Sequence, residues 1–194
     1  MSHYWYLSAT LPGLLFGAAP PMSEEEFLAL CRHNLSSADC AETVAAIGYL
    51  NSDKVPETLR SGFLASFLAW ERTFRNELAR LRARRFNRSE EEFVRPSKRS
   101  DEAGRVAASC FAIDDPYQAE LNLERERWNA IERLSSLSTF DLDFIIAYRM
   151  KLAINERLER LNAETGSAGY RHLYDDILST ASRTAETDNL GEKA

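Results

Sequence analysis

Apolar residues in the second half of the chain recur at helical spacing. Between residues 117 and 134 they follow one another at intervals of three, four and seven, which predicts a helix with one apolar stripe (Tyr117, Leu121, Trp128, Ile131 and Leu134). Asp115-Pro116 marks its start, because aspartate caps free N–H groups and proline suits the first helical turn. The opposite face carries charges of both signs, and we expect that face to meet water (Glu124, Arg125, Glu126, Arg127, Glu132 and Arg133).

A second long helix follows a turn at Ser138–Asp141. Its apolar positions cover more than one face, so we expect it to pack against several neighbours (Leu142, Ile145, Ile146, Leu152, Ile154, Leu158 and Leu161). Ser138 or Thr139 is expected to cap it, with Asp141 and Asp143 in the first turn and Gly166 at its end. The two helices are predicted to form the antiparallel hairpin around which the chain is organised.

The longest helix is predicted from Pro56 to about Phe86. A nearly unbroken stripe runs along it (Leu59, Phe63, Phe67, Trp70, Phe74, Leu78 and Leu81). About 30 residues at 1.5 Å each make a rod of about 45 Å, which would pair with equally long helices or project.

Shorter helices flank these three. Ser23 and Glu26 form a capping box that starts a helix from Glu24 to about Asn34. Its expected inward residues are Phe27, Leu28 and Leu30. The other predicted helical segments are Ala38 to Leu50 (apolar at Val44, Ile47 and Tyr49 or Leu50), a turn over Arg105 to Phe111, and Ala168 to Ser182.

The remaining segments have the composition of connections. Residues 4–11 are aromatic and β-leaning, which suggests a short extended N-terminal segment. Residues 87–104 are rich in charge and are expected to form an exposed loop, and the tail 184–194 is expected to be disordered. The predicted fold class is all-α: an elongated helical bundle built on long antiparallel helices, with one domain over residues 1–183.

Composition narrows the class of protein. The chain has 194 residues, 44% of them hydrophobic, and a net charge of −6. No apolar run approaches the ~20 residues that a membrane span needs. The apolar stretch 11–19 lacks a basic leader and is interrupted by Pro12 and Gly13, so we do not interpret it as a signal peptide. Cys31, Cys40 and Cys110 are expected to be reduced thiols of a cytoplasmic protein.

Few residues suggest chemistry. Cys31, His33 and Cys40 share a segment, as zinc ligands would, but a structural site needs four ligands and their spacing fits no familiar pattern. His172 lies at helical spacing from Asp175 and Asp176, without a nucleophile motif beside it. Neither a phosphate-binding glycine loop nor a hydrolase or metalloprotease motif occurs. We therefore expect no catalytic residues, cofactor or metal, and predict a protein that is not an enzyme.

The basic end of the longest helix is the strongest polar feature, and its candidate interaction residues are Arg82, Arg84, Arg85 and Arg88. Three interpretations remain open. It could be a solvated helix end, a contact for an acidic protein or the anionic surface beside a membrane, or a phosphate-binding region. The acidic total and the absence of a recognised motif argue against nucleic acid.

Four blocks of sequence together resemble an uncharacterised bacterial family that is encoded in V-type ATPase gene clusters. The first is Tyr4 to Pro12 with Leu15-Phe16-Gly17, and the second is Pro20 to Phe27. The third combines Asp115-Pro116, Ala119-Glu120 and Arg127-Trp128, and the fourth runs from Phe140 to Arg157. The resemblance covers the chain from Tyr4 to about Gly166.

The resemblance implies an accessory or structural subunit of a bacterial V/A-type ATPase, in contact with stalk and rotor-ring subunits and with the membrane through them. It is similar in class to the all-helical socket component that joins the rotor ring to the central shaft, although this chain is about half the size expected of that component. The alternative is a free-standing helical adaptor or regulator that binds another protein through its long hairpin.

Overall fold

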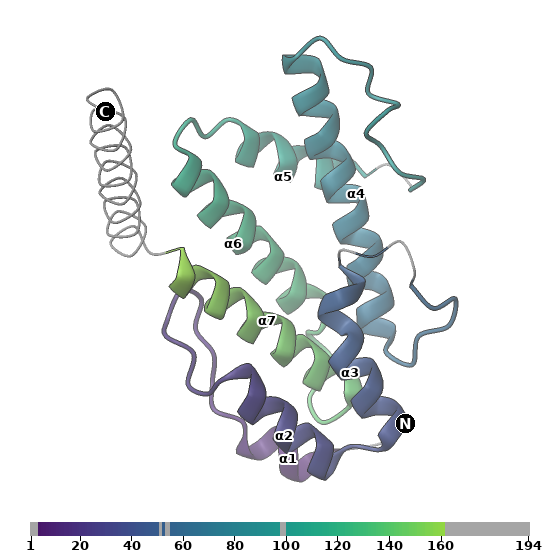
Figure 1. Ribbon diagram of the computed structural model, residues 1–194, viewed down its shortest axis with the longest axis vertical. Helices are drawn as coiled ribbons and strands as arrows, with labels where there is room; N and C mark the ends of the chain where they lie inside the picture. Colours follow the sequence, from purple (N-terminus) through teal and green to yellow (C-terminus); the bar gives the residue numbers. More distant parts are fainter. Residues whose placement is uncertain (1–3, 51, 53–54, 98–99, 162–194) are drawn as a thin grey trace, which may run out of the picture. The chain divides into compact units, whose positions relative to one another are not determined.

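The computed structural model describes residues 4–50, 52, 55–97 and 100–161 (Figure 1). Within these ranges the chain forms seven helices and no strand, which confirms the all-α prediction. They are α1 (Trp5–Thr10), α2 (Glu24–Asn34), α3 (Ser37–Tyr49), α4 (Gly62–Arg85), α5 (Asp101–Phe111), α6 (Pro116–Leu134) and α7 (Leu142–Arg160). None of these helices is long and apolar enough to cross a membrane. The chain divides into two compact units, Met1–Glu156 and Arg157–Ala194, and the contacts below all lie in the first.

Helix α7 contacts most of the other elements of this unit. Its buried residues lie on several faces, as predicted (among them Ile145, Ile146, Tyr148, Leu152 and Ile154). The expected cap at Ser138 or Thr139 is wrong, because the Asp141 carboxylate accepts the Phe144 N–H at 3.0 Å and so caps the helix. The predicted end at Gly166 lies outside the described residues.

One apolar core joins α1, α2 and α7 through Leu7, Phe27, Cys31, Ile145, Tyr148 and Leu152. The Phe27 and Tyr148 rings stack with their centroids 5.4 Å apart. The Ser23–Glu26 capping box starts α2 where the sequence predicted it. The inward placement of Leu30 is wrong, because Leu30 is 38% exposed and Cys31 is buried on the core side instead.

Polar side chains of α7 hold the segment that leads into α2. The Asn155 amide donates to the Leu15 carbonyl at 2.9 Å and accepts the Gly17 N–H at 3.1 Å. Gly17 has a φ of +75°, which glycine adopts at little cost. Glu156 accepts the Glu24 N–H at 2.8 Å at the start of α2. These contacts fix a long irregular connection without regular secondary structure.

The start of α4 differs from the prediction. The helix begins at Gly62 with Ser61 as its N-cap, so the predicted start at Pro56 is wrong. Two carboxylates from other helices explain the position. Glu42 of α3 accepts the N–H groups of Arg60 and Ser61, each at 2.8 Å. Asp143 of α7 accepts the Ser61 hydroxyl at 2.6 Å and the Phe63 N–H at 3.2 Å, which satisfies donors at the helix end.

A second core lies between α4, α5 and α6 and consists of Phe74, Leu78, Ala107, Cys110 and Leu123. The predicted stripe of α4 is confirmed at Phe63, Phe67, Phe74 and Leu78, which are buried. Trp70 and Leu81 are partly buried against the same core, and Leu59 lies before the helix. Helix α5 begins at Asp101, with the Ser100 hydroxyl as its cap. The predicted loop 87–104 is therefore too long, since its last four residues are helical.

Helix α6 begins as predicted, with Asp115 as the N-cap and Pro116 in the first turn. The prediction that its charged face meets water is wrong for Glu124 and Arg127. Glu124 is 1% exposed, and Arg127 pairs both with Glu124 at 2.9 Å and with Glu71 of α4 at 3.1 Å. Each of these charges lies beside a charge of opposite sign, which offsets part of the cost of burial.

The N-terminal prediction is also corrected. Trp5–Thr10 is helix rather than extended chain. The Tyr4 hydroxyl donates to the carboxylate of Asp39, a buried residue of α3, which anchors this helix to the body. In α3 the polar residues Asp39, Glu42 and Thr43 are buried, whereas Val44, which was predicted to belong to its apolar face, is 43% exposed.

Candidate functional site

The basic end of α4 contains the four predicted interaction residues, and all four are exposed. Arg84 is paired with Glu90 at 2.6 Å, and the Arg85 guanidinium lies 5.7 Å from the centre of the Phe111 ring. Within the described part of the chain no ion pair is recorded for Arg82 or Arg88. The structure therefore places the four residues at one helix end but neutralises only one of them with a carboxylate.

A fixed turn follows these arginines. Asn87 has a φ of +51°, the left-handed conformation that ends many helices. The Arg88 N–H donates to the Ala83 carbonyl at 2.9 Å and the Asn87 N–H to the Arg84 carbonyl at 3.2 Å, the paired bonds of a Schellman motif. The turn leaves Phe86 71% exposed. From the sequence, Phe86 was expected only as the end of a helix. The signal for its exposure is Asn87, since asparagine tolerates this turn.

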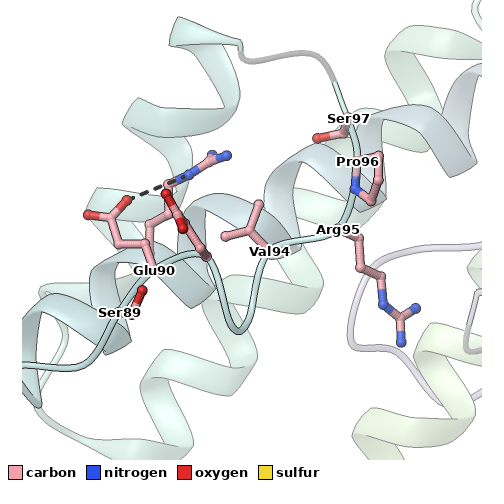
Figure 2. A pocket seen from close by; sticks show the side chains of 8 residues that line it. Ser89, Glu90, Val94, Arg95, Pro96 and Ser97 are labelled. Atoms are coloured by element: carbon pink, nitrogen blue, oxygen red, sulfur yellow. Dashed lines mark ion pairs between the residues drawn. The ribbon is translucent and has the colours of Figure 1, made fainter.

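A cavity of about 660 Å³ lies between α4 and the segment after it (Figure 2). Arg80, Glu90, Glu91 and Arg95 contribute charges to its lining, with Ser89, Val94, Pro96 and Ser97. Arg80 lies between two carboxylates: its Nε is 3.9 Å from Glu90 Oε2, and its Nη1 is 2.5 Å from Glu77 Oε1. Glu90 also pairs with Arg84 at 2.6 Å, so this carboxylate of the cavity lies between two arginines.

Asn76 of α4 holds the far side of this segment. Its amide donates to the Arg95 carbonyl at 2.8 Å and to the Ser97 hydroxyl at 2.7 Å, and it accepts the Arg95 N–H at 3.0 Å. Asn76 is 3% exposed. The charged segment after α4 is thus bound to the side of this helix at Arg95 and Ser97.

A second surface is aromatic and lies at α1 and the turn before α7. Trp5 is 58% and Tyr6 75% exposed. The Trp5 ring stacks on Phe140 with centroids 4.1 Å apart, and the Tyr4 N–H donates to the Phe140 carbonyl. We call Trp5, Tyr6 and Phe140 the Trp5 face. Leu137, in the same turn as Phe140, is 96% exposed.

Of the three residues weighed as zinc ligands, Cys31 and Cys40 lie in the same apolar core. Among the residues that the structure describes, no group of three metal-ligating side chains could hold an ion. Cys31 is buried and His33 exposed, although both lie on α2. Burial raises the pKa of the Cys31 thiol to about 12, which leaves it protonated at neutral pH. His172, Asp175 and Asp176 lie outside the described residues.

Asp39, Arg127 and Arg149 each pair with an oppositely charged side chain inside the protein. Burial alone would raise the pKa of Asp39, but hydrogen bonds from Tyr4, Arg60 and Ser36 outweigh it and lower that pKa. Burial would lower the pKa of Arg127, and the neighbouring charges of Glu71 and Glu124 raise it instead. For Arg149 burial prevails over the attraction of Glu24, and its pKa is lowered. These groups join helices to one another, which is a structural role.

Comparisons with protein-family models, with curated proteins and with solved structures found no match to this chain.

Proposed function

We propose that this protein is a non-catalytic accessory or structural subunit of a bacterial V/A-type ATPase, in the position of the socket between rotor ring and central shaft. The observation that carries the proposal is the Trp5 face. Trp5 and Tyr6 belong to the first sequence block that resembles the ATPase-associated family, and Phe140 begins the last block. Residues from both ends of the resemblance thus meet on one exposed aromatic surface.

An exposed aromatic surface favours a protein-binding role. Side chains such as Trp and Tyr are enriched at protein interfaces, where burying them contributes much of the binding energy. Trp5 is held in place by its stack on Phe140, so little conformational freedom is lost when a partner covers it.

The interior supports a mechanical rather than a chemical role. Carboxylates and amides of α3 and α7 fix the start of α4 and the connection before α2. Helices that are joined by such hydrogen bonds can transmit force between partners without an active site. ATP would be hydrolysed by other subunits of the complex.

The second candidate function is a free-standing helical adaptor that binds another protein. The same exposed aromatic residues favour it, since they specify an interface without specifying the complex. The partners recovered from the cell distinguish the two.

The test is an affinity purification of the tagged full-length chain from its native host after gentle solubilisation of membranes. Recovery of ATPase stalk and ring subunits in fixed ratio is the expected result. A Trp5→Ala/Tyr6→Ala variant should lose them, whereas a matched Val44→Ala/Tyr117→Ala variant, which trims half-exposed residues on α3 and α6, should keep them. Recovery of the chain alone would refute the subunit proposal. Unrelated partners would favour the adaptor.

A further inference from the structure

We propose that the basic end of α4 is a second docking site, which receives a protein partner whose apolar pocket is ringed by carboxylates. Phe86 is the inserted side chain, and Arg82, Arg85 and Arg88 are its cationic rim. The inference rests on the proposed function to the extent that the chain acts by binding proteins, and it assigns a surface separate from the Trp5 face.

The charge of this surface is uncompensated. Arg84 is matched by Glu90 at 2.6 Å, and Arg85 lies against the Phe111 ring. No ion pair is recorded for Arg82 or Arg88 within the described residues. Three arginine charges in a small area therefore remain available for carboxylates that approach from outside.

The apolar component is Phe86, which is 71% exposed. Arg82 lies one helical turn before it, on the same side of α4, because residues four apart are neighbours on a helix. A large ring beside arginines matches the composition of interface hot spots, in which aromatic residues and arginine dominate.

The surface is also held in shape before any partner binds. The Schellman bonds from Arg88 to Ala83 and from Asn87 to Arg84 fix the backbone on both sides of Phe86. The Phe111 ring restrains Arg85. A fixed surface loses less entropy on binding, so these features favour a specific contact.

A local acidic pocket fits this surface better than a polyanion does. Glu91 and Glu92 are exposed immediately after the turn, and the whole chain carries a net charge of −6. A DNA duplex or an anionic bilayer presents negative charge over a wide area and would meet these acids as well as the arginines. A protein pocket can place carboxylates opposite the arginines alone.

The test places a photo-reactive benzoyl-phenylalanine at position 86 of the full-length chain in its native host. After irradiation the cross-linked partner peptide is identified by mass spectrometry. We expect a peptide with carboxylates beside apolar residues. Arg82→Glu/Arg88→Glu in the same chain should reduce the cross-link about tenfold or more, because like charges then face each other. The matched Arg32→Glu/Arg72→Glu variant reverses two exposed arginines away from this surface and should leave the yield unchanged.

A charge exchange completes the experiment. Lysines in place of the carboxylates in the identified peptide should restore the cross-link to Arg82→Glu/Arg88→Glu. A yield that is insensitive to these reversals, with circular dichroism unchanged, would overturn the inference. It would also be overturned if the purified chain bound phosphatidylglycerol vesicles or duplex DNA through the same arginines.

The outcomes separate this inference from the proposed function. Charge-dependent cross-linking to a protein outside the ATPase would support the docking site and refute the subunit proposal. Recovery of ATPase subunits through the Trp5 face, without charge-dependent cross-linking at position 86, would support the subunit proposal and refute the docking site.

Discussion

Replacing Arg127 by methionine should destabilise the protein far more than the same change at another arginine of α6. Arg127 lies between two carboxylates that are almost fully buried, Glu71 at 2% and Glu124 at 1% exposed. Methionine keeps much of the side-chain volume, so the main loss is the charge. Removing one member of a buried ion pair costs about 3–5 kcal/mol, because the remaining charge is left without compensation.

The lower end of that range applies here. Glu71 keeps a second partner, Arg75, at 2.6 Å, whereas Glu124 loses its ion pair with Arg127 at 2.9 Å. We expect a loss of about 3 kcal/mol in the free energy of unfolding. With a urea dependence of about 2 kcal/mol per molar, the unfolding midpoint should fall by about 1.5 M.

The assay is urea unfolding followed by circular dichroism at neutral pH. The control is Arg133→Met on the same helix, where the pair with Glu102 is about half exposed on both sides and contributes about 0.2–1 kcal/mol. A second variant, Glu124→Leu/Arg127→Met, also removes the carboxylate that pairs with Arg127 at 2.9 Å and should recover part of the loss. Equal effects of Arg127→Met and Arg133→Met would refute the reasoning that the buried charges depend on Arg127.

Three further predictions concern other parts of the molecule. Asp143→Ala removes the acceptors for the Ser61 hydroxyl and the Phe63 N–H, and it should lower the free energy of unfolding in urea by about 1–2 kcal/mol. Asp114→Ala, at an exposed position, is the control. An unchanged unfolding midpoint for Asp143→Ala would contradict the capping role. The pKa of Asp39 is lowered from 3.8, so its carboxylate stabilises the fold above about pH 4, and this contribution is lost as the pH falls below that value. The difference in free energy of unfolding between wild type and Asp39→Asn should therefore become smaller in acid. A difference that does not change with pH would refute this prediction. Iodoacetamide at neutral pH should modify Cys40, which is half-buried, before Cys31, whose pKa is about 12, and mass spectrometry showing the reverse order would contradict the buried placement of Cys31.

Locally determined features were predictable from the sequence. The capping box at Ser23 and Glu26, the start of α6 at Asp115-Pro116 and the apolar stripe of α4 each depend on residues close together in the chain. Their signals are short-range hydrogen bonds and helical spacing, which a sequence displays directly.

Features that depend on distant partners were missed. The start of α4 is set by Glu42 and by Asp143, which lies 82 residues from Ser61 along the chain. The burial of Arg127 depends on Glu71, which is 56 residues away. A charged residue on a helix is expected to face water unless an oppositely charged residue is known to lie against it. Helical periodicity alone therefore predicted wrongly that this part of α6 faces water.

The candidate surfaces divide in the same way. The four arginines at the end of α4 were visible as a cluster in the sequence. The exposure of Phe86 was not, because it depends on the left-handed turn at Asn87. The Trp5 face was not predicted for a different reason. The aromatic residues near the chain end suggested an extended segment, whereas Trp5 and Tyr6 lie in helix α1 and Trp5 stacks on Phe140.

The separation between framework and surface makes the proposals testable. Side chains of α7 reach the start of α4 and the connection before α2, so substitutions at Asp143 or Asn155 should disturb folding broadly. Tyr6, Arg82 and Arg88 are exposed and lie outside these contacts. Their replacement should leave the unfolding midpoint nearly unchanged, since substitutions away from structural features usually alter stability by less than about 0.5 kcal/mol. A loss of binding at these positions can therefore be assigned to the surface itself rather than to the loss of the fold that presents it.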